Sequence, residues 1–200
     1  MSLCLLADQT HGERIGGGRT TGEVAKLVPI LKDRAGKETR PEAGPTPQRK
    51  EDAMKLNVYL AGEIHTDWRE AVKSACEGLE IEWSGPVTDH GASDDCGVEI
   101  FGAEEDKFWH DRKGASLNAI RIRTGIERCD VLVVCFGEKY KQWNAAFDAG
   151  YAAALGKPII VLQPPEHDHA LKEVDAAANA VARTPEQVAR ALRYVTTAAL

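Results

Sequence analysis

The sequence predicts a single α/β domain with a parallel sheet of about five strands and helices on both faces. Short apolar runs alternate with helical patterns over residues 54–200, which is the order of elements in a parallel sheet with right-handed crossovers. The run at 131–136 is apolar throughout, as is typical of a strand buried on both faces. With 200 residues and 43% hydrophobic composition, the chain can bury one good core.

Residues 1–53 differ from the rest of the chain. They contain no Phe, Trp or Tyr, and they hold seven Gly and four Pro. Such a composition predicts a disordered N-terminal extension. Because Met54 directly precedes the first expected strand, a start codon assigned too far upstream is the alternative interpretation.

Five short segments are the expected strands, at 55–61, 80–84, 131–136, 159–162 and 179–182. The first helix should begin at Thr66 or Asp67, with Asp67 and Glu70 at capping-box spacing, and end near residue 78. We read 88–97 as a polar loop, 104–113 as a short helix and 116–129 as a separate helix capped by Ser116.

The two remaining helices have clear end signals. The alanine-rich helix over 143–155 should close at Gly156, in a left-handed cap, because Pro158 cannot continue it. The last helix should start at Thr184, with Pro185 in its first turn and Gln187 at the box position. Together the elements predict a Rossmann-like or flavodoxin-like fold.

The charge of the expected domain argues against binding a nucleic-acid duplex. Residues 1–53 carry nine basic and eight acidic side chains, a net of +1, so the total of −6 leaves −7 for the rest. Duplex binding needs a basic surface. A local basic cluster either binds a phosphate group or, as we favour, is a solvated helix face; it comprises Arg112, Lys113, Arg121, Arg123 and Arg128.

The cysteines and apolar runs indicate a soluble, cytoplasmic protein. The five cysteines are odd in number and form no Cys-x-x-Cys pair, so we expect neither a disulfide framework nor a zinc ribbon. No run reaches the roughly 18 apolar residues of a membrane span. There is no Gly-x-Gly-x-x-Gly and no Walker sequence, and we expect 167–169 (His-Asp-His) to be solvated, so no cofactor or metal is predicted.

Ligands of open parallel sheets bind where the carboxyl ends of the strands meet the following loops. Asp148 is expected at this edge, as a carboxylate among alanines. If Asn144 caps the helix, Asp148 lies in its first turn, where the helix dipole favours the ionised carboxylate. An ordinary helix-start carboxylate is the alternative.

Several segments resemble the nucleoside 2-deoxyribosyltransferase superfamily, namely Tyr59–Gly62, Asp130–Val134 and Asp148–Pro158. Gly62–Glu70 and Phe136–Asn144 resemble its YtoQ-type branch, and the resemblance covers 54 to about 195. It implies that a helix carboxylate attacks the anomeric carbon of a deoxyribosyl group. The superfamily uses Glu where this chain has Asp148, and it commonly has carboxylates where this chain has Gln142 and Ile122.

The resemblance and the strand-end positions together define the candidate site residues. We expect Asp148 to be the nucleophile, with Asp89 or His90 as the acid for the leaving base and Asp94 and Glu63 as further candidates for that acid. The expected substrate-binding residues are Tyr59, Gly62, Glu63, His65, Asp94, Trp143, Asn144 and Tyr151.

Some of these residues have a purely structural interpretation. The aromatic series Tyr140, Trp143, Phe147 and Tyr151 favours a core-facing stripe over a platform for base stacking. Tyr59, within a strand, is more typical of a residue beside the core than of one whose hydroxyl reaches a ligand.

The predicted function is cleavage or exchange of the N-glycosidic bond of a small-molecule nucleoside or nucleotide, with hydrolysis favoured over transfer. The alternative is a nucleotide-binding or sensing module without activity, favoured by the missing carboxylates. Because the superfamily often builds its site across subunits, we also expect a homo-oligomer.

Overall fold

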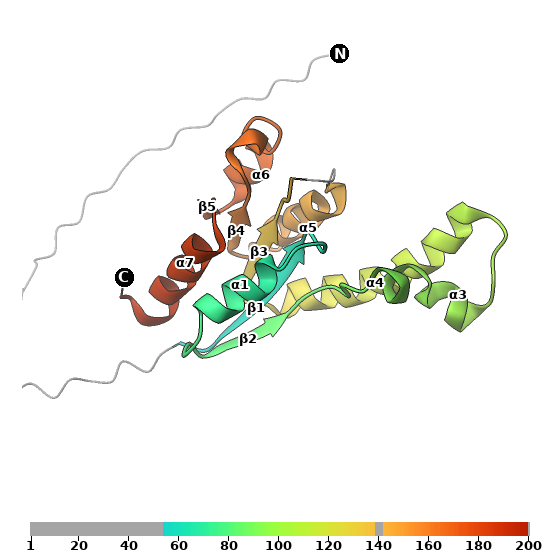
Figure 1. Ribbon diagram of the computed structural model, residues 1–200, viewed down its shortest axis with the longest axis horizontal. Coiled ribbons are helices and arrows are strands. Elements are labelled where there is room, and N and C mark those ends of the chain that lie inside the picture. Colours follow the sequence, from blue (N-terminus) through green and yellow to red (C-terminus); the bar gives the residue numbers. More distant parts are fainter. Residues whose placement is uncertain (1–53, 139–141, 200) are drawn as a thin grey trace, which may run out of the picture. The chain divides into compact units, whose positions relative to one another are not determined.

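The computed structural model describes residues 54–138 and 142–199, and its centre is a five-stranded sheet (Figure 1). All strands are parallel, in the order β2-β1-β3-β4-β5. The strands are β1 (Leu56–Gly62), β2 (Ile81–Ser84), β3 (Val131–Cys135), β4 (Ile159–Leu162) and β5 (Ala180–Ala182). The predicted fold class is confirmed, whereas the extension predicted for 1–53 lies outside the described residues.

Helices cover both faces of this sheet. Helices α1 (Trp68–Ala75) and α7 (Pro185–Thr197) pack on one face, and α4 (Lys107–Arg128), α5 (Trp143–Ala154) and α6 (Lys172–Ala177) lie on the other. Side chains of β1 alternate between the two cores, and all of β3 is buried. Strands β1 and β3 are therefore packed between helices on both faces of the sheet.

The strand order creates a crevice at the carboxyl edge. From β1 the chain crosses to β2 on one side and then returns to β3 on the other. The connections that leave β1 and β3 therefore diverge, and such a switch point is where open α/β sheets bind ligands.

The region before β3 differs from the prediction. The expected polar loop at 88–97 contains the short helix α2 (His90–Asp94) and the start of a second short helix, α3 (Cys96–Phe101). The two helices expected over 104–113 and 116–129 are the single 22-residue helix α4, capped by Asp106, which accepts a hydrogen bond from Phe108 N at 2.8 Å.

Long-range packing explains why α4 does not break. The Ser116 hydroxyl, expected to cap a helix, donates instead to the carbonyl of Arg112 within the same helix, at 2.7 Å. Gly114 lies in mid-helix because a Cβ at this position would collide with the carbonyl oxygen of Asp94. Helices α2 and α3 thus pack closely on the N-terminal half of α4, which stands away from the sheet in Figure 1.

The helix ends agree with most of the remaining predictions. Gly156 has a φ of +67°, the left-handed cap that was expected. Thr184 Oγ1 accepts from Gln187 N at 3.3 Å, as predicted for the start of α7. The capping box at α1 was wrong, because Asp67 precedes the helix without a capping bond from its side chain. None of the helices among the described residues is long and apolar enough to cross a membrane.

Candidate functional site

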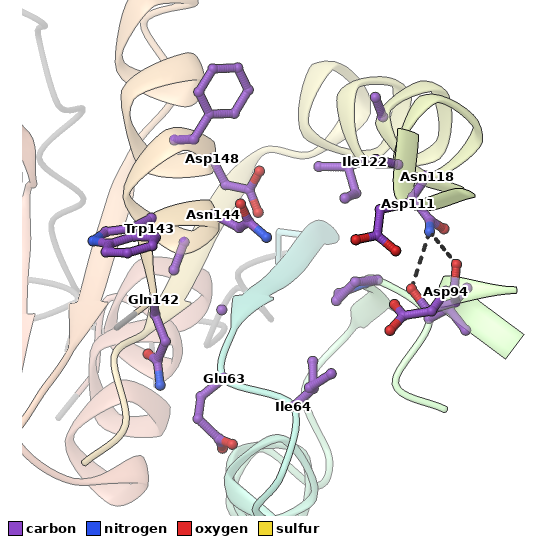
Figure 2. A pocket seen from close by; sticks show the side chains of 18 of the residues that line it. Glu63, Ile64, Asp94, Asp111, Asn118, Ile122, Gln142, Trp143, Asn144 and Asp148 are labelled. Atoms are coloured by element: carbon purple, nitrogen blue, oxygen red, sulfur yellow. Dashed lines mark hydrogen bonds between the residues drawn. The ribbon is translucent and has the colours of Figure 1, made fainter. Parts of the chain in front are cut away.

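A pocket of about 680 Å³ lies between the carboxyl edge of the sheet, α4 and α5 (Figure 2). Eight of the eleven residues predicted for the site line it: Gly62, Glu63, His65, Asp94, Trp143, Asn144, Asp148 and Tyr151. Its size suits a small organic ligand, for which pockets of roughly 300–1,000 Å³ are usual. Segments widely separated in the sequence thus meet at one cavity.

Asp148 is a half-buried carboxylate in the second turn of α5. The helix begins at Trp143 with Gln142 as its N-cap, so the prediction that Asn144 caps it and places Asp148 in the first turn was wrong. Burial raises the pKa of the Asp148 carboxyl to about 6, which is opposite to the expected effect of the helix dipole. Figure 2 shows this carboxylate pointing away from α5 into the pocket.

Tyr59 lies in the core, as its position within a strand predicted. Its side chain is 2% exposed, and a Cβ on Gly125 would collide with the ring. The hydroxyl has no hydrogen-bond partner among the described residues. Burial, and then the negative charge of Asp148, raise the pKa of Tyr59. The lining of the pocket does not include Tyr59.

Gly62 is required by the geometry of the turn that follows β1. Its φ is +95°, and a Cβ would collide with the carbonyl oxygen of Cys135 on β3. Only glycine combines a positive φ with such a close backbone approach. The adjacent ends of β1 and β3 therefore hold the floor of the pocket in one conformation.

Glu63 is buried, and its carboxylate organises this turn. It accepts hydrogen bonds from the backbone N–H groups of His65 and Thr66 and from the Thr66 hydroxyl. The buried Arg69 guanidinium donates to the carbonyls of Gly62 and Glu63. Figure 2 shows the Glu63 carboxylate directed away from Asp148, so its geometry favours a structural role over proton transfer.

The acid candidates after β2 occupy different environments. Asp89 caps α2, accepting from Ala92 N at 2.7 Å, and His90 Nδ1 lies 2.8 Å from Asp94 Oδ2. The His90 ring stacks on His65, with centroids 6.1 Å apart. Of these, Asp94 and His65 line the pocket, whereas Asp89 and His90 do not. The geometry therefore does not favour Asp89 or His90 as the acid.

One wall of the pocket was not predicted. It is formed by α4, through Lys107, Asp111, Asn118, Ile122 and Arg123 among others. Asn118 donates to the Ser93 carbonyl at 2.9 Å and so fixes α2 against α4. The spacing of 111, 115, 118 and 122 is that of one helix face, a signal that was hidden because the segment was divided into two helices.

The aromatic side chains of α5 differ in their surroundings. Trp143 and Phe147 are 75% and 64% exposed and both line the cavity, so the favoured prediction of a core-facing stripe was wrong for these two. Tyr151 is half-buried and packs against the core. The Tyr151 hydroxyl donates to Glu127 Oε1 at 2.5 Å. Tyr140 lies outside the described residues.

The two positions at which the resemblance implies carboxylates, 122 and 142, both lie in the pocket. Ile122 contributes an apolar side chain from α4. The Gln142 amide oxygen accepts from Gly137 N at 2.8 Å, so this side chain is bonded to the backbone that follows β3. Across the described residues, there is no group of three or more His, Cys, Asp or Glu side chains arranged to hold a metal ion.

Two solved structures are remotely similar to this chain. A 2-deoxyribosyltransferase from Bacillus psychrosaccharolyticus is 16% identical, with a TM-score of 0.44, covering 66% of this chain and 90% of its own. The CMP N-glycosidase BcmB of Clostridium botulinum is 15% identical, with a TM-score of 0.41, covering 68% of this chain and 98% of its own.

Sequence comparison is more decisive. Residues 59–196 match the family model described as nucleoside 2-deoxyribosyltransferase YtoQ. The uncharacterized protein YtoQ of Bacillus subtilis (strain 168) is 42% identical over 144 residues, which cover 71% of this chain and 97% of the relative. Because the model spans more than half of the chain and the relative is covered almost completely, the chain belongs to the nucleoside 2-deoxyribosyltransferase YtoQ family.

Proposed function

We propose that this protein cleaves the N-glycosidic bond of a nucleoside or nucleotide, with Asp148 as the nucleophile. The observation that carries the proposal is a half-buried carboxylate, with a pKa of about 6, pointing into a pocket of about 680 Å³. Perturbed ionisation inside a cleft is typical of catalytic groups. Membership of the YtoQ family supports the same reaction class.

The chemistry follows that of a retaining glycosidase. The Asp148 carboxylate attacks the anomeric carbon as the bond to the base breaks, and a glycosyl-enzyme ester forms. A deoxyribosyl group lacks the 2′-hydroxyl, which makes the cationic transition state easier to reach. Because burial raises the free energy of the Asp148 anion, forming the neutral ester relieves an unfavourable desolvation.

An Asp in place of Glu changes where the sugar must lie. The side chain is one methylene shorter, and a misplacement of about 1 Å can cost roughly 10²-fold in rate. The sugar must therefore approach the backbone of α5 more closely than a Glu nucleophile would require.

We favour hydrolysis over transfer to a second base. The carboxylates of Asp94 and Asp111 at the pocket wall are 54% and 61% exposed, so water reaches the cavity from this side. A transferase has to exclude water while one base replaces another.

Release of free base from purified protein tests the proposal. We would incubate the wild type with deoxynucleosides, ribonucleosides and their 5′-monophosphates and quantify bases by chromatography. We expect release from at least one compound, and loss of release in Asp148→Ala and Asp148→Asn. No release, or release unaffected by these substitutions, would contradict the proposal.

A nucleotide-binding module without activity is the second candidate. It is favoured by Gln142 and Ile122, neither of which can transfer a proton, at the pocket positions where relatives commonly have carboxylates. A thermal-shift screen of nucleotides and sugar phosphates separates the two functions. Saturable binding without base release over long incubation would favour the module.

A further inference from the structure

The α4 wall of the pocket carries a carboxylate that the resemblance to relatives does not account for. Asp111 lies on the same face of α4 as Ile122, because eleven residues are close to three whole turns at about 3.6 residues per turn. Both residues line the pocket. Figure 2 shows the Asp111 carboxylate across the cavity from Asp148, with both directed into the space between α4 and α5. A sugar bound against Asp148 therefore has Asp111 on its far side.

Asp111 also has a partner that can supply a proton. His110 Nδ1 lies 3.4 Å from Asp111 Oδ1, and His110 Nε2 lies 3.3 Å from Asp95 Oδ1. An imidazole can donate to two carboxylates at once only when both of its nitrogens carry protons. Three titratable groups, Asp95, His110 and Asp111, thus form a chain that ends at the pocket.

Asp94 is the neighbouring alternative, and its surroundings differ from those of Asp111. It lies at the end of the five-residue helix α2, and His90 Nδ1 approaches its Oδ2 at 2.8 Å. Asp111 belongs to the 22-residue helix α4, whose fully buried Ile126 fixes the helix against the sheet close to α5. Asp111 is therefore held relative to Asp148 by one continuous helix, and its contact with a histidine is longer.

We infer that Asp111, positioned by His110, is the acid that protonates the leaving base, in place of the carboxylates absent at 142 and 122. This inference rests on the proposed function.

Cleavage proceeds in two steps. In the first step, Asp148 bonds to the anomeric carbon as the carbon–nitrogen bond breaks, and the electron pair of that bond stays on the base nitrogen. The His110 imidazolium passes its proton to Asp111, which gives it to the base. In the second step, water attacks the anomeric carbon, its proton returns through Asp111 to His110, and the sugar is released together with the Asp148 carboxylate.

A pair of substrates that differ only in the need for an acid tests this role. 2′-Deoxyguanosine requires protonation of its base, whereas the base of 7-methyl-2′-deoxyguanosine already carries a positive charge and leaves without it. We would measure kcat/KM on both compounds, and on their 5′-monophosphates, for the wild type, Asp111→Asn, Asp94→Asn and Asp148→Asn.

We expect Asp111→Asn to lower kcat/KM on the unmethylated compound by roughly 10²–10⁴-fold and on the methylated compound by less than about tenfold. Asp148→Asn should abolish cleavage of both. His110→Asn should show the same preference for the methylated compound, and the double variant should be no slower than Asp111→Asn. Such a preference reports on proton transfer, which a merely structural role would not alter.

The controls separate this inference from the proposed function. Glu77→Gln, on the exposed surface after α1, should leave both rates unchanged. Equal losses on both substrates in Asp111→Asn, no loss, or a methyl-dependent loss in Asp94→Asn instead would overturn the role of Asp111 alone. If the wild type cleaves neither compound nor any other tested nucleoside, the proposed function falls and this inference falls with it.

Discussion

Burial raises the pKa of the Asp148 carboxyl, so this group ionises within the pH range of ordinary assays. With a pKa of about 6, roughly half of the carboxyl groups are ionised at pH 6 and about one-tenth at pH 5. Because a nucleophile acts as the anion, log kcat/KM on a substrate that needs no acid should rise with a slope of about one below pH 6 and level off above it. Initial rates on 7-methyl-2′-deoxyguanosine, measured from about pH 4.5 to pH 8, check this. A profile without a break in this range would contradict it.

The same ionisation links Asp148 to stability. The folded-state pKa of about 6 exceeds the ordinary 3.8, so the folded protein disfavours the anion. The resulting destabilisation is absent below pH 3.8, grows as the pH rises towards 6 and is fully present above 6.

Asp148→Asn should therefore stabilise the fold at neutral pH and leave it unchanged in acid. We expect the free energy of unfolding to increase by about 1–2 kcal/mol at pH 7.5, a value reduced to allow for partial exposure of the side chain. Urea denaturation at pH 7.5 and at about pH 4 measures it. A variant destabilised at pH 7.5 would show that Asp148 makes a stabilising contact as an anion.

Two glycines in helix interiors provide a matched test of how α4 and α5 are packed. Gly150 in α5 is exposed, and an added Cβ meets nothing within 4 Å, so Gly150→Ala should stabilise by about 0.5–1 kcal/mol through helix propensity. Gly114 in α4 is buried against Asp94, so Gly114→Ala should destabilise by about 1–3 kcal/mol. Denaturant midpoints compare the two. A stabilised Gly114→Ala would show that α2 does not pack on α4 as described.

The elements that the sequence predicts are those specified by their own residues. Strands β3 and β4 are continuous apolar runs, and the start of α7 carries its cap at Thr184. Helices α2 and α3 were missed because they are only five and six residues long and the packing on α4 that supports them involves distant residues. The close contact of Gly114 with Asp94 cannot be predicted from the sequence of α2 or of α4 alone.

The site residues also divide into those that their own segment predicts and those that depend on distant residues. Residues at the ends of β1 and in α5 were predicted because parallel strands place their carboxyl ends at one edge. Asp111 was not predicted, since it reaches the pocket only if 107–128 is one helix. The exposure of Trp143 was also not predicted, because helical spacing of aromatics does not say which side the helix buries.

At the scale of the whole molecule, the α3–α4 region exposes apolar surface that a monomer would leave in water. The exposed fractions of Ile100, Phe101, Phe108, Trp109 and Ile120 are all above one half. Exposed apolar side chains gathered on two adjacent helices favour an interaction site. We therefore expect a second copy of the chain to bind here, giving a homodimer or larger assembly. Light scattering should give at least twice the monomer mass, and Phe108→Glu with Trp109→Glu should reduce it to one chain. A monomeric wild type would contradict this.

One wall of the pocket is built on the sheet, and the other is α4, which extends away from the sheet. A small rotation of α4 about its buried end therefore moves its far end by a larger distance. Ile126 anchors α4 in the core, while Asp111 lies fifteen residues earlier, roughly 22 Å away at about 1.5 Å per residue. A tilt of only about 3° at the anchor displaces Asp111 by roughly 1 Å, a shift to which catalytic rates respond strongly. The stiffness of that anchor, far from the reacting bond, therefore sets how accurately the two sides of the pocket face each other.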